Sequence, residues 1–157
     1  MKTLWLKVIP ALVCLLLMSS CSSAPSLSAV LVDVTNCRPD PTGATAELTL
    51  KYANENMFAL AIETTTGSLY LNNTYIGKFQ QNNPIGLVQL GTATGKGTLV
   101  IEKPAVYQAI LKDAASGSVS YRLVSKMRLE ISEEKTTIKN ESTGQLAREL
   151  LQAEPVK

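Results

Sequence analysis

The chain has 157 residues, with fifteen lysines and arginines against thirteen aspartates and glutamates, for a formal net charge of +2. It contains three cysteines and no histidine, which excludes Ser-His and Cys-His nucleophile pairs and histidine-ligated metals. A charge so close to balance gives little attraction for nucleic acid or anionic lipid. The length suits one domain with a hydrophobic core.

The first twenty residues have the layout of a secretory signal. Two lysines precede or begin an apolar stretch over 8–18, and small residues lead up to Cys21. That stretch is too short for a helix that crosses a bilayer, which needs roughly 20 apolar residues. We therefore expect 1–20 to be a signal peptide, cleaved between Ser20 and Cys21, rather than a transmembrane anchor.

The end of this leader, Leu17–Cys21, reads Leu-Met-Ser-Ser-Cys and resembles the lipobox of bacterial lipoproteins. The resemblance implies that Cys21 carries a diacylglycerol on its sulfur and an acyl group such as palmitate on its amine. Two lipid signals hold a protein on a membrane stably, whereas one acyl chain binds only marginally. The residue after Cys21 is Ser22 rather than aspartate. This choice resembles that of enterobacterial lipoproteins sorted to the outer membrane, which implies a periplasm-facing site in a Gram-negative host. The alternative is an ordinary signal peptide with an incidental cysteine.

Cysteine usage follows from the leader. Cys14 would leave with it and Cys21 would become a thioether, so Cys37 would be the one thiol of the mature chain, which could then form no intramolecular disulfide. We expect Cys37 to be buried and inert, with intermolecular pairing as the alternative. Loss of the two leader lysines would leave thirteen basic and thirteen acidic residues, which argues against a nucleic-acid partner.

A short linker separates the leader from the folded part. Residues 21–28 are rich in serine and alanine and include Pro25, a composition typical of a polar tether. We place one folded domain at 29–147, because the mature chain has the size of an ordinary single domain. Residues 148–157 are assigned to a C-terminal tail.

Most of the domain has the period of two that is typical of strands with one buried face. Apolar and polar residues alternate over 46–52 and again over 119–131. In chain order, further strands are predicted at 29–34, 58–64, 86–92, 98–102 and 136–139.

A tight hairpin is predicted within 69–76. Asn72–Asn73 lies between two short apolar runs, and asparagine tolerates the positive φ that a two-residue turn requires. Gly67 and Gly77 flank the hairpin, and we interpret them as bulge or turn positions.

Two segments have helical spacing instead. Pro104 stands at a favourable first helical position, with apolar side chains from Tyr107 to Leu111 on one face before Gly117. This pattern predicts a short helix that crosses between strands. Residues 145–153 carry three leucines at helical spacing and predict a second short helix, either packed on its own domain as a terminal turn or exposed to dock a partner.

Taken in order over 27–146, these features resemble the late embryogenesis abundant (LEA) type 2 family, which carries the water stress and hypersensitive response domain. The resemblance rests on 54–60 (Asn-Glu-Asn-Met-Phe-Ala-Leu), on 69–77, on the crossing segment with the strand pair after it, and on 142–146. Glu55 stands where the family usually has proline. The resemblance implies an all-β fold, a single immunoglobulin-like or fibronectin type III-like β-sandwich of about seven strands with a short crossing helix. It also implies a link to desiccation or other water stress, and no catalytic residues.

The residues themselves give no support to catalysis. Gly91–Thr98 superficially resembles a phosphate-binding loop, but its glycine spacing is one residue short and Gly97 replaces the magnesium-binding serine or threonine. Glu133–Glu134 are neighbours, so on a strand they would point to opposite faces and could not act as a paired acid and base. We therefore expect a non-enzymatic protein without metal, cofactor or small-molecule substrate, apart from the covalent lipid at Cys21.

Binding features are few. Five tyrosines, two phenylalanines and one tryptophan, which lies in the leader, predict no stacking platform for sugars or single-stranded nucleic acid. Asn54, Asn56 and the glutamine and asparagine run 80–83 are the polar features that merit testing. We interpret the first two as residues that shape a turn through side-chain to backbone hydrogen bonds.

Two hypotheses follow for function. The first, from the family resemblance, is a lipid-anchored envelope protein that supports water-stress tolerance by contacting membrane or client proteins. The alternative is an accessory or assembly lipoprotein that docks one envelope partner by adding a strand to a sheet edge. Its contact would be the edge at 136–139, or Leu146 and Leu150.

Overall fold

The computed structural model describes residues 25–40, 43–114 and 117–151. The leader, including Ser20, and Cys21 lie outside the described residues. The described chain forms eight strands, one α-helix and one 3₁₀-helix, in this order: β1 (Leu27–Asp40), β2 (Gly43–Asn54), β3 (Leu60–Leu71), β4 (Thr74–Gln81), β5 (Ile85–Leu87), β6 (Thr92–Ile101), α2 (Pro104–Asp113), β7 (Ser118–Ile131), β8 (Glu134–Ala147) and η1 (Arg148–Leu151).

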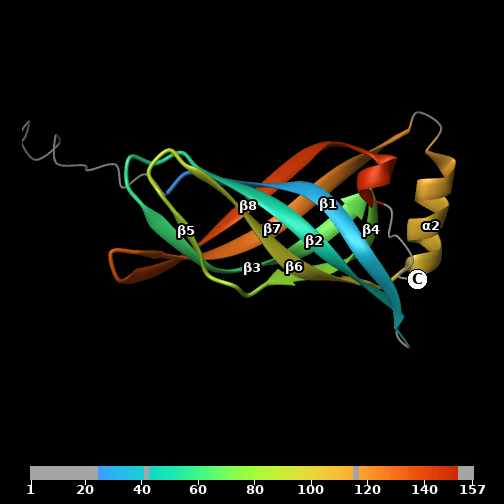
Figure 1. Cartoon of the computed structure of the whole chain (residues 1–157), viewed down its shortest axis with the longest axis horizontal. Helices are drawn as coiled ribbons and strands as arrows, with labels where there is room; N and C mark the ends of the chain where they lie inside the picture. Colours follow the sequence, from blue (N-terminus) through green and yellow to red (C-terminus); the bar gives the residue numbers. More distant parts are fainter. Residues whose placement is uncertain (1–24, 41–42, 115–116, 152–157) are drawn as a thin grey trace, which may run out of the picture.

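The strands form one antiparallel sheet in the order β1-β2-β6-β4-β3-β7-β8, with β5 paired to β3. The sheet curls until its first and last strands approach each other, and Ala29 N donates to Asn140 Oδ1 across that gap at 3.3 Å (Figure 1). The predicted all-β class is confirmed. The predicted two-layer sandwich is not confirmed, because hydrogen bonding connects the strands along one continuous path.

Alternating side chains fill the inside of the curl. The predicted alternation over 46–52 is seen in β2, where every second residue is buried, and β7 repeats it. Fully buried large side chains come from most of the strands and from the helix: Leu48, Leu50, Tyr52, Ile62, Leu69, Leu71, Ile76, Leu99, Ile101, Tyr107, Leu123 and Met127. Each contributes about 1.5–3 kcal/mol relative to an exposed position.

The predicted hairpin is confirmed. Asn72 and Asn73 connect β3 to β4 with φ of 45° and 62°, the left-handed pair of a type I′ turn. The strands predicted at 58–64 and 69–71 are one strand, β3. The chain does not break at Gly67, because this residue pairs with β4 on one side and with β7 on the other.

The glycine-rich run belongs to a strand rather than to a connection. The strand predicted at 86–92 shrinks to the three residues of β5, and β6 begins at Thr92 instead of residue 98. β6 begins here because all of it, Thr92–Ile101, pairs with β2. Within this ladder lies Gly95, where a Cβ would stand 2.3 Å from Ile85 Cδ1 and 3.2 Å from Tyr52 Cε2. Glycine at position 95 leaves room for the larger side chains of Ile85 and Tyr52, which pack closely against β6.

The helix predicted from Pro104 is confirmed as α2, and its Tyr107 and Leu111 are buried. The helix predicted over 145–153 is wrong. β8 continues to Ala147 in register with β7, and only the 3₁₀ turn η1 follows. Leu151 in η1 is buried and accepts a hydrogen bond from Tyr107 Oη through its carbonyl oxygen, so α2 and η1 lie together at one end of the sheet (Figure 1).

Candidate functional site

At the end of the sheet opposite α2, the β2–β3 loop lies beside the β5–β6 loop (Figure 1), and both are hydrogen-bonded to the side chain of Asn54. This residue ends β2 and is only 2% exposed. Its Nδ2 donates to the carbonyl oxygen of Phe58 at 2.8 Å and to that of Val88 at 2.9 Å. Its Oδ1 accepts from the backbone N–H of Asn56 at 3.0 Å and from Asn56 Nδ2 at 2.8 Å. One buried amide thus joins the β2–β3 loop to the β5–β6 loop.

Backbone hydrogen bonds complete this junction. Asn54 N donates to the carbonyl oxygen of Gly91 at 2.8 Å, and Leu90 N donates to that of Asn56 at 3.1 Å. Gly91 N donates to the carbonyl oxygen of Val88 at 3.1 Å within the β5–β6 loop. These main-chain bonds connect the two loops directly and supply partners for several of their peptide groups.

The chain enters the domain at the same place. Ser26 N donates to Asn56 Oδ1 at 3.0 Å, and the Ser26 carbonyl oxygen accepts from Asn56 Nδ2 at 2.7 Å and from Glu55 N at 3.2 Å. Ser26 Oγ also donates to Glu55 Oε2 at 2.6 Å. The residue before β1 is thus fixed against the β2–β3 loop by side-chain and main-chain contacts together.

Four large apolar side chains project from these two loops, and we call them the apolar tip. They are the four most exposed large hydrophobic residues in the described part of the chain: Met57 (73%), Val88 (69%), Leu90 (62%) and Phe58 (44%). The strand predictions at 58–64 and 86–92 included three of them, Phe58, Val88 and Leu90, so sequence reasoning missed their exposure. The available signal was a dense apolar run beside Asn54 and Asn56 that the strand period did not explain.

Leu90 has an unfavourable backbone conformation. Its φ is 52°, in the left-handed region that is disfavoured for a side chain with a Cβ. The conformation lets Leu90 N reach the Asn56 carbonyl oxygen while the leucine side chain stays in solvent. Strain that is kept in place by surrounding hydrogen bonds is a feature of functional loops.

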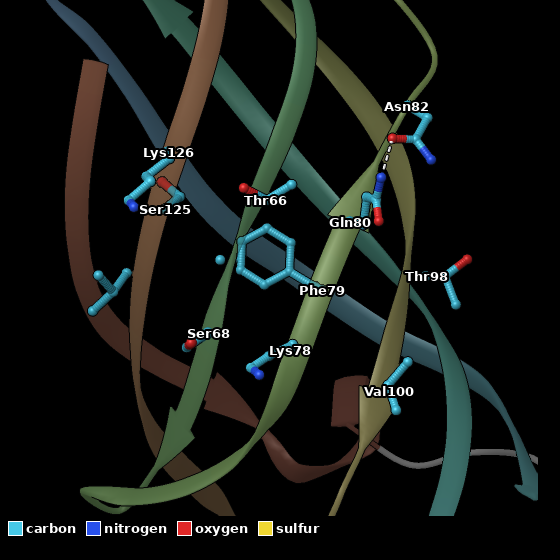
Figure 2. Close-up of a pocket in the computed structure, with 12 residues that line it drawn as sticks. Thr66, Ser68, Lys78, Phe79, Gln80, Asn82, Thr98, Val100, Ser125 and Lys126 are labelled. Carbon is cyan, nitrogen blue, oxygen red and sulfur yellow. Dashed lines mark hydrogen bonds between the residues drawn. The ribbon is translucent and has the colours of Figure 1, made fainter. Parts of the chain in front are cut away.

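A second candidate is a shallow groove of about 610 Å³ on the outside of β7, β3, β4 and β6. Figure 2 shows its polar rim, where Gln80 Nε2 donates to Asn82 Oδ1 at 2.7 Å. Lys78 and Lys126 line it together with serine and threonine hydroxyls, and the ring of Phe79 lies between strands β3 and β4 (Figure 2). No carboxylate or thiol lines the groove, and its lysine and hydroxyl side chains can donate hydrogen bonds to a ligand.

Gly67 and Gly77 are both strand residues at places of close approach. A Cβ on Gly67 would stand 2.7 Å from the Phe79 ring, and a Cβ on Gly77 would stand 1.9 Å from the Val100 carbonyl oxygen. The β3–β4 register shifts beside Gly77, where Leu69 and Tyr70 pair with Gly77 and Tyr75. These glycines allow tight strand packing below the groove.

An exposed ion-pair cluster spans β3, β7 and β8. Glu63 accepts from Lys135 Nζ at 2.5 Å and from Arg128 Nε at 2.8 Å. The hydrogen bond from Lys135, with the charges of both cations, holds the pKa of Glu63 below its usual value. Each member already has an opposite charge in contact, so we interpret the cluster as cross-strand pairing.

Cys37 is half-buried and packs against the core, so the expected burial is met only in part. Burial raises the pKa of its thiol, which keeps the reactive thiolate scarce near neutral pH. Burial, and then the charge of Cys37, raise the pKa of Tyr107 as well. Neither group has the lowered pKa of an activated nucleophile.

The remaining predicted features are not part of the apolar tip or lie outside the described residues. Ser132 and Glu133 form the β7–β8 turn with φ of 49° and 73°, and Glu134 begins β8. Ser20 and Cys21 lie outside the described residues. Over 25–40, 43–114 and 117–151 no group of three potential metal ligands comes together, and no helix in the same ranges has the length and apolar character to span a bilayer.

Comparison with known proteins gives structural matches only. No family model matches the sequence, and no curated protein matches it either. Among solved structures, the chain is similar to the Arabidopsis thaliana protein AT1g01470, at 12% identity and a TM-score of 0.57, over 83% of this chain and 87% of that one. At this identity the likeness shows a shared fold and nothing finer.

Two further matches have lower TM-scores. One is the late embryogenesis abundant (LEA) protein candidate At2g46140.1, at 18% identity and a TM-score of 0.48, over 92% of this chain and 88% of that one. The other is a protein from Archaeoglobus fulgidus, at 14% identity and a TM-score of 0.42, over 78% of this chain and 94% of that one. A LEA protein candidate is thus among the structures that this chain resembles at low identity.

Proposed function

We propose that this chain is a non-enzymatic lipoprotein of the bacterial envelope, held on a membrane through lipid on Cys21. The lipobox-like sequence from Leu17 to Cys21 is the observation that carries the proposal. The domain then faces the periplasm from the outer membrane in a Gram-negative host, and its partners are the membrane and other proteins, without nucleic acid, metal or small-molecule cofactor.

Its role is tolerance of water stress through contacts with membrane or client proteins, as a member of the LEA type 2 family with its sandwich-type domain. The resemblance over 54–60 and 69–77 supports this role. A protective role of this kind needs an accessible protein surface and a stable fold rather than a catalytic site.

Anchoring and protection have separate tests. Cys21→Ser should release the protein from isolated membranes into the soluble fraction, while Cys37→Ser should leave it bound, and equal retention of the two variants would contradict the anchor. For protection, the purified protein should preserve the activity of an enzyme through a drying cycle better than an equal mass of an unrelated lipoprotein. Equal recovery would contradict the stress role.

A docking role remains the second candidate because β8 ends the hydrogen-bonded path of the sheet. Thr136, Thr137 and Lys139 are exposed along it, which suits addition of a partner strand. Leu146 instead packs against the core, so Leu150 is the better exposed contact of the two leucines. Cross-linking followed by detergent extraction and mass spectrometry should then recover one partner in near-equal amount, whereas recovery of no dominant partner would favour stress protection.

A further inference from the structure

The apolar tip exposes four large hydrophobic side chains to solvent. Met57, Phe58, Val88 and Leu90 project together from two loops that one buried asparagine joins. Exposed apolar side chains scattered singly are ordinary, but a group of them at one place marks a contact surface.

The surface that contacts the apolar tip is indicated by Ser26, where the chain enters the domain beside the tip. Ser26 is fixed against the β2–β3 loop by its bonds to Glu55 and Asn56, and Cys21 lies five positions before it. Five residues span at most about 18 Å even when fully extended. A lipid on Cys21 would therefore keep the apolar tip beside the bilayer surface.

The chemistry of the loops suits hydrocarbon. The carbonyl oxygens of Asn56, Phe58 and Val88 all accept hydrogen bonds inside the junction, so contact with acyl chains would leave none of them without a partner. Unsatisfied peptide groups are what normally bars irregular backbone from lipid. The strained φ of Leu90 is also explained, since it keeps an apolar side chain outward while its N–H stays bonded.

Resting on the lipid anchor proposed above, we infer that the apolar tip inserts into the lipid bilayer interface and orients the domain on the membrane. The lipid supplies attachment and the tip supplies a second, apolar contact, so the sheet stands with α2 directed away from the membrane. The tip loops contain no lysine or arginine, and their one charged residue is Glu55, which accepts a hydrogen bond from Ser26 Oγ. Glu133 lies in the adjacent β7–β8 turn. Insertion therefore depends on acyl chains and not on anionic headgroups.

The test uses the full chain, processed in a bacterial host and reconstituted into neutral phosphatidylcholine vesicles with bromine on the acyl chains. Phe58→Trp and Met57→Trp place a fluorophore at the tip, and two positions protect against a variant that fails to fold. Val106→Trp, exposed on α2 at the other end of the sheet, is the matched control. We expect roughly two-fold quenching of the tip tryptophans and little at residue 106, because interfacial side chains reach the acyl boundary.

Vesicle flotation separates this inference from the anchor. Protein that floats with the vesicles but shows no quenching at residue 57 or 58 would overturn tip insertion and leave the anchor standing. Failure to float, with the same behaviour for Cys21→Ser, would overturn both. Equal quenching at residue 106, or a photo-crosslinker at residue 57 that captures protein instead of lipid, would also overturn the oriented insertion.

Discussion

Asn54→Ala gives the sharpest test of how the two loops are held. The change removes four side-chain hydrogen bonds, two donated to carbonyl oxygens and two accepted from Asn56. Each is worth about 0.5–1.5 kcal/mol net, with water able to replace part of it, so we expect a loss of about 2–4 kcal/mol in the free energy of unfolding. The melting temperature should fall by on the order of 10 °C for a domain of this size.

Urea unfolding followed by circular dichroism in detergent measures this loss, and hydrogen exchange locates it. The Leu90 amide, bonded to the Asn56 carbonyl oxygen, should exchange faster in the variant. Asn83→Ala is the matched control, because Asn83 is exposed and surface substitutions stay within about 0.5 kcal/mol. Equal stability of the two variants would refute the conclusion that the Asn54 side chain holds the β2–β3 and β5–β6 loops together.

Asn54→Asp separates donors from acceptors at constant size. It keeps the two bonds from Asn56 and turns an oxygen toward the two carbonyl oxygens that Nδ2 now contacts. The new carboxyl should have a raised pKa in the folded state, so the variant should be most stable below the unfolded value of about 3.9 and lose stability as pH rises. A stability gap to the wild type that does not change with pH would contradict this geometry.

Three further changes test the sheet and its ends by urea unfolding. Gly77→Ala places a Cβ 1.9 Å from a carbonyl oxygen of β6 and should cost about 2–4 kcal/mol, whereas Gly86→Ala, in open space, should cost little; equal losses would contradict the packing. Glu63 has a lowered pKa, so its stabilisation is present above its unfolded pKa of about 4.3 and is lost as pH falls. The difference in free energy of unfolding between wild type and Glu63→Gln should therefore disappear in acid. A difference that stays constant with pH would count against the ion pairs. Tyr107→Phe removes the hydrogen bond to the Leu151 carbonyl oxygen and should lower the free energy of unfolding by about 1 kcal/mol, with faster proteolysis of η1. An unchanged rate of cleavage would argue against the role of this hydrogen bond in holding η1.

Local patterns predicted the parts of the fold that local physics determines. Asn72–Asn73 specified its turn because few residue pairs accept two positive φ values, and Pro104 marked the start of α2. The leucine spacing over 145–153 failed because pairing of β8 with β7 outweighs helical propensity there. The single curled path of the sheet could not be predicted, since strand periodicity does not say which strands pair.

The candidate site was predicted only in part. Asn54 and Asn56 were selected from their position at the end of a strand, but their partners come from β5–β6 and from Ser26, which are distant in sequence. The exposure of Val88 and Leu90 depends on that junction and on a backbone conformation unusual for leucine. Neither could be inferred from hydrophobicity alone.

The strand order has a consequence for the time course of folding. Three hairpins, β1–β2, β3–β4 and β7–β8, join strands that follow one another, whereas the ladders β2–β6 and β3–β7 pair residues as distant as Ala46 with Leu99 and Leu69 with Leu123. Such pairs form late, because long loops must close before they gain any contact. We expect early hairpins, followed by a slow step that joins them. Until β6 and β7 arrive, β2 and β3 present bare strand edges, so the protein is most prone to self-association during its own synthesis.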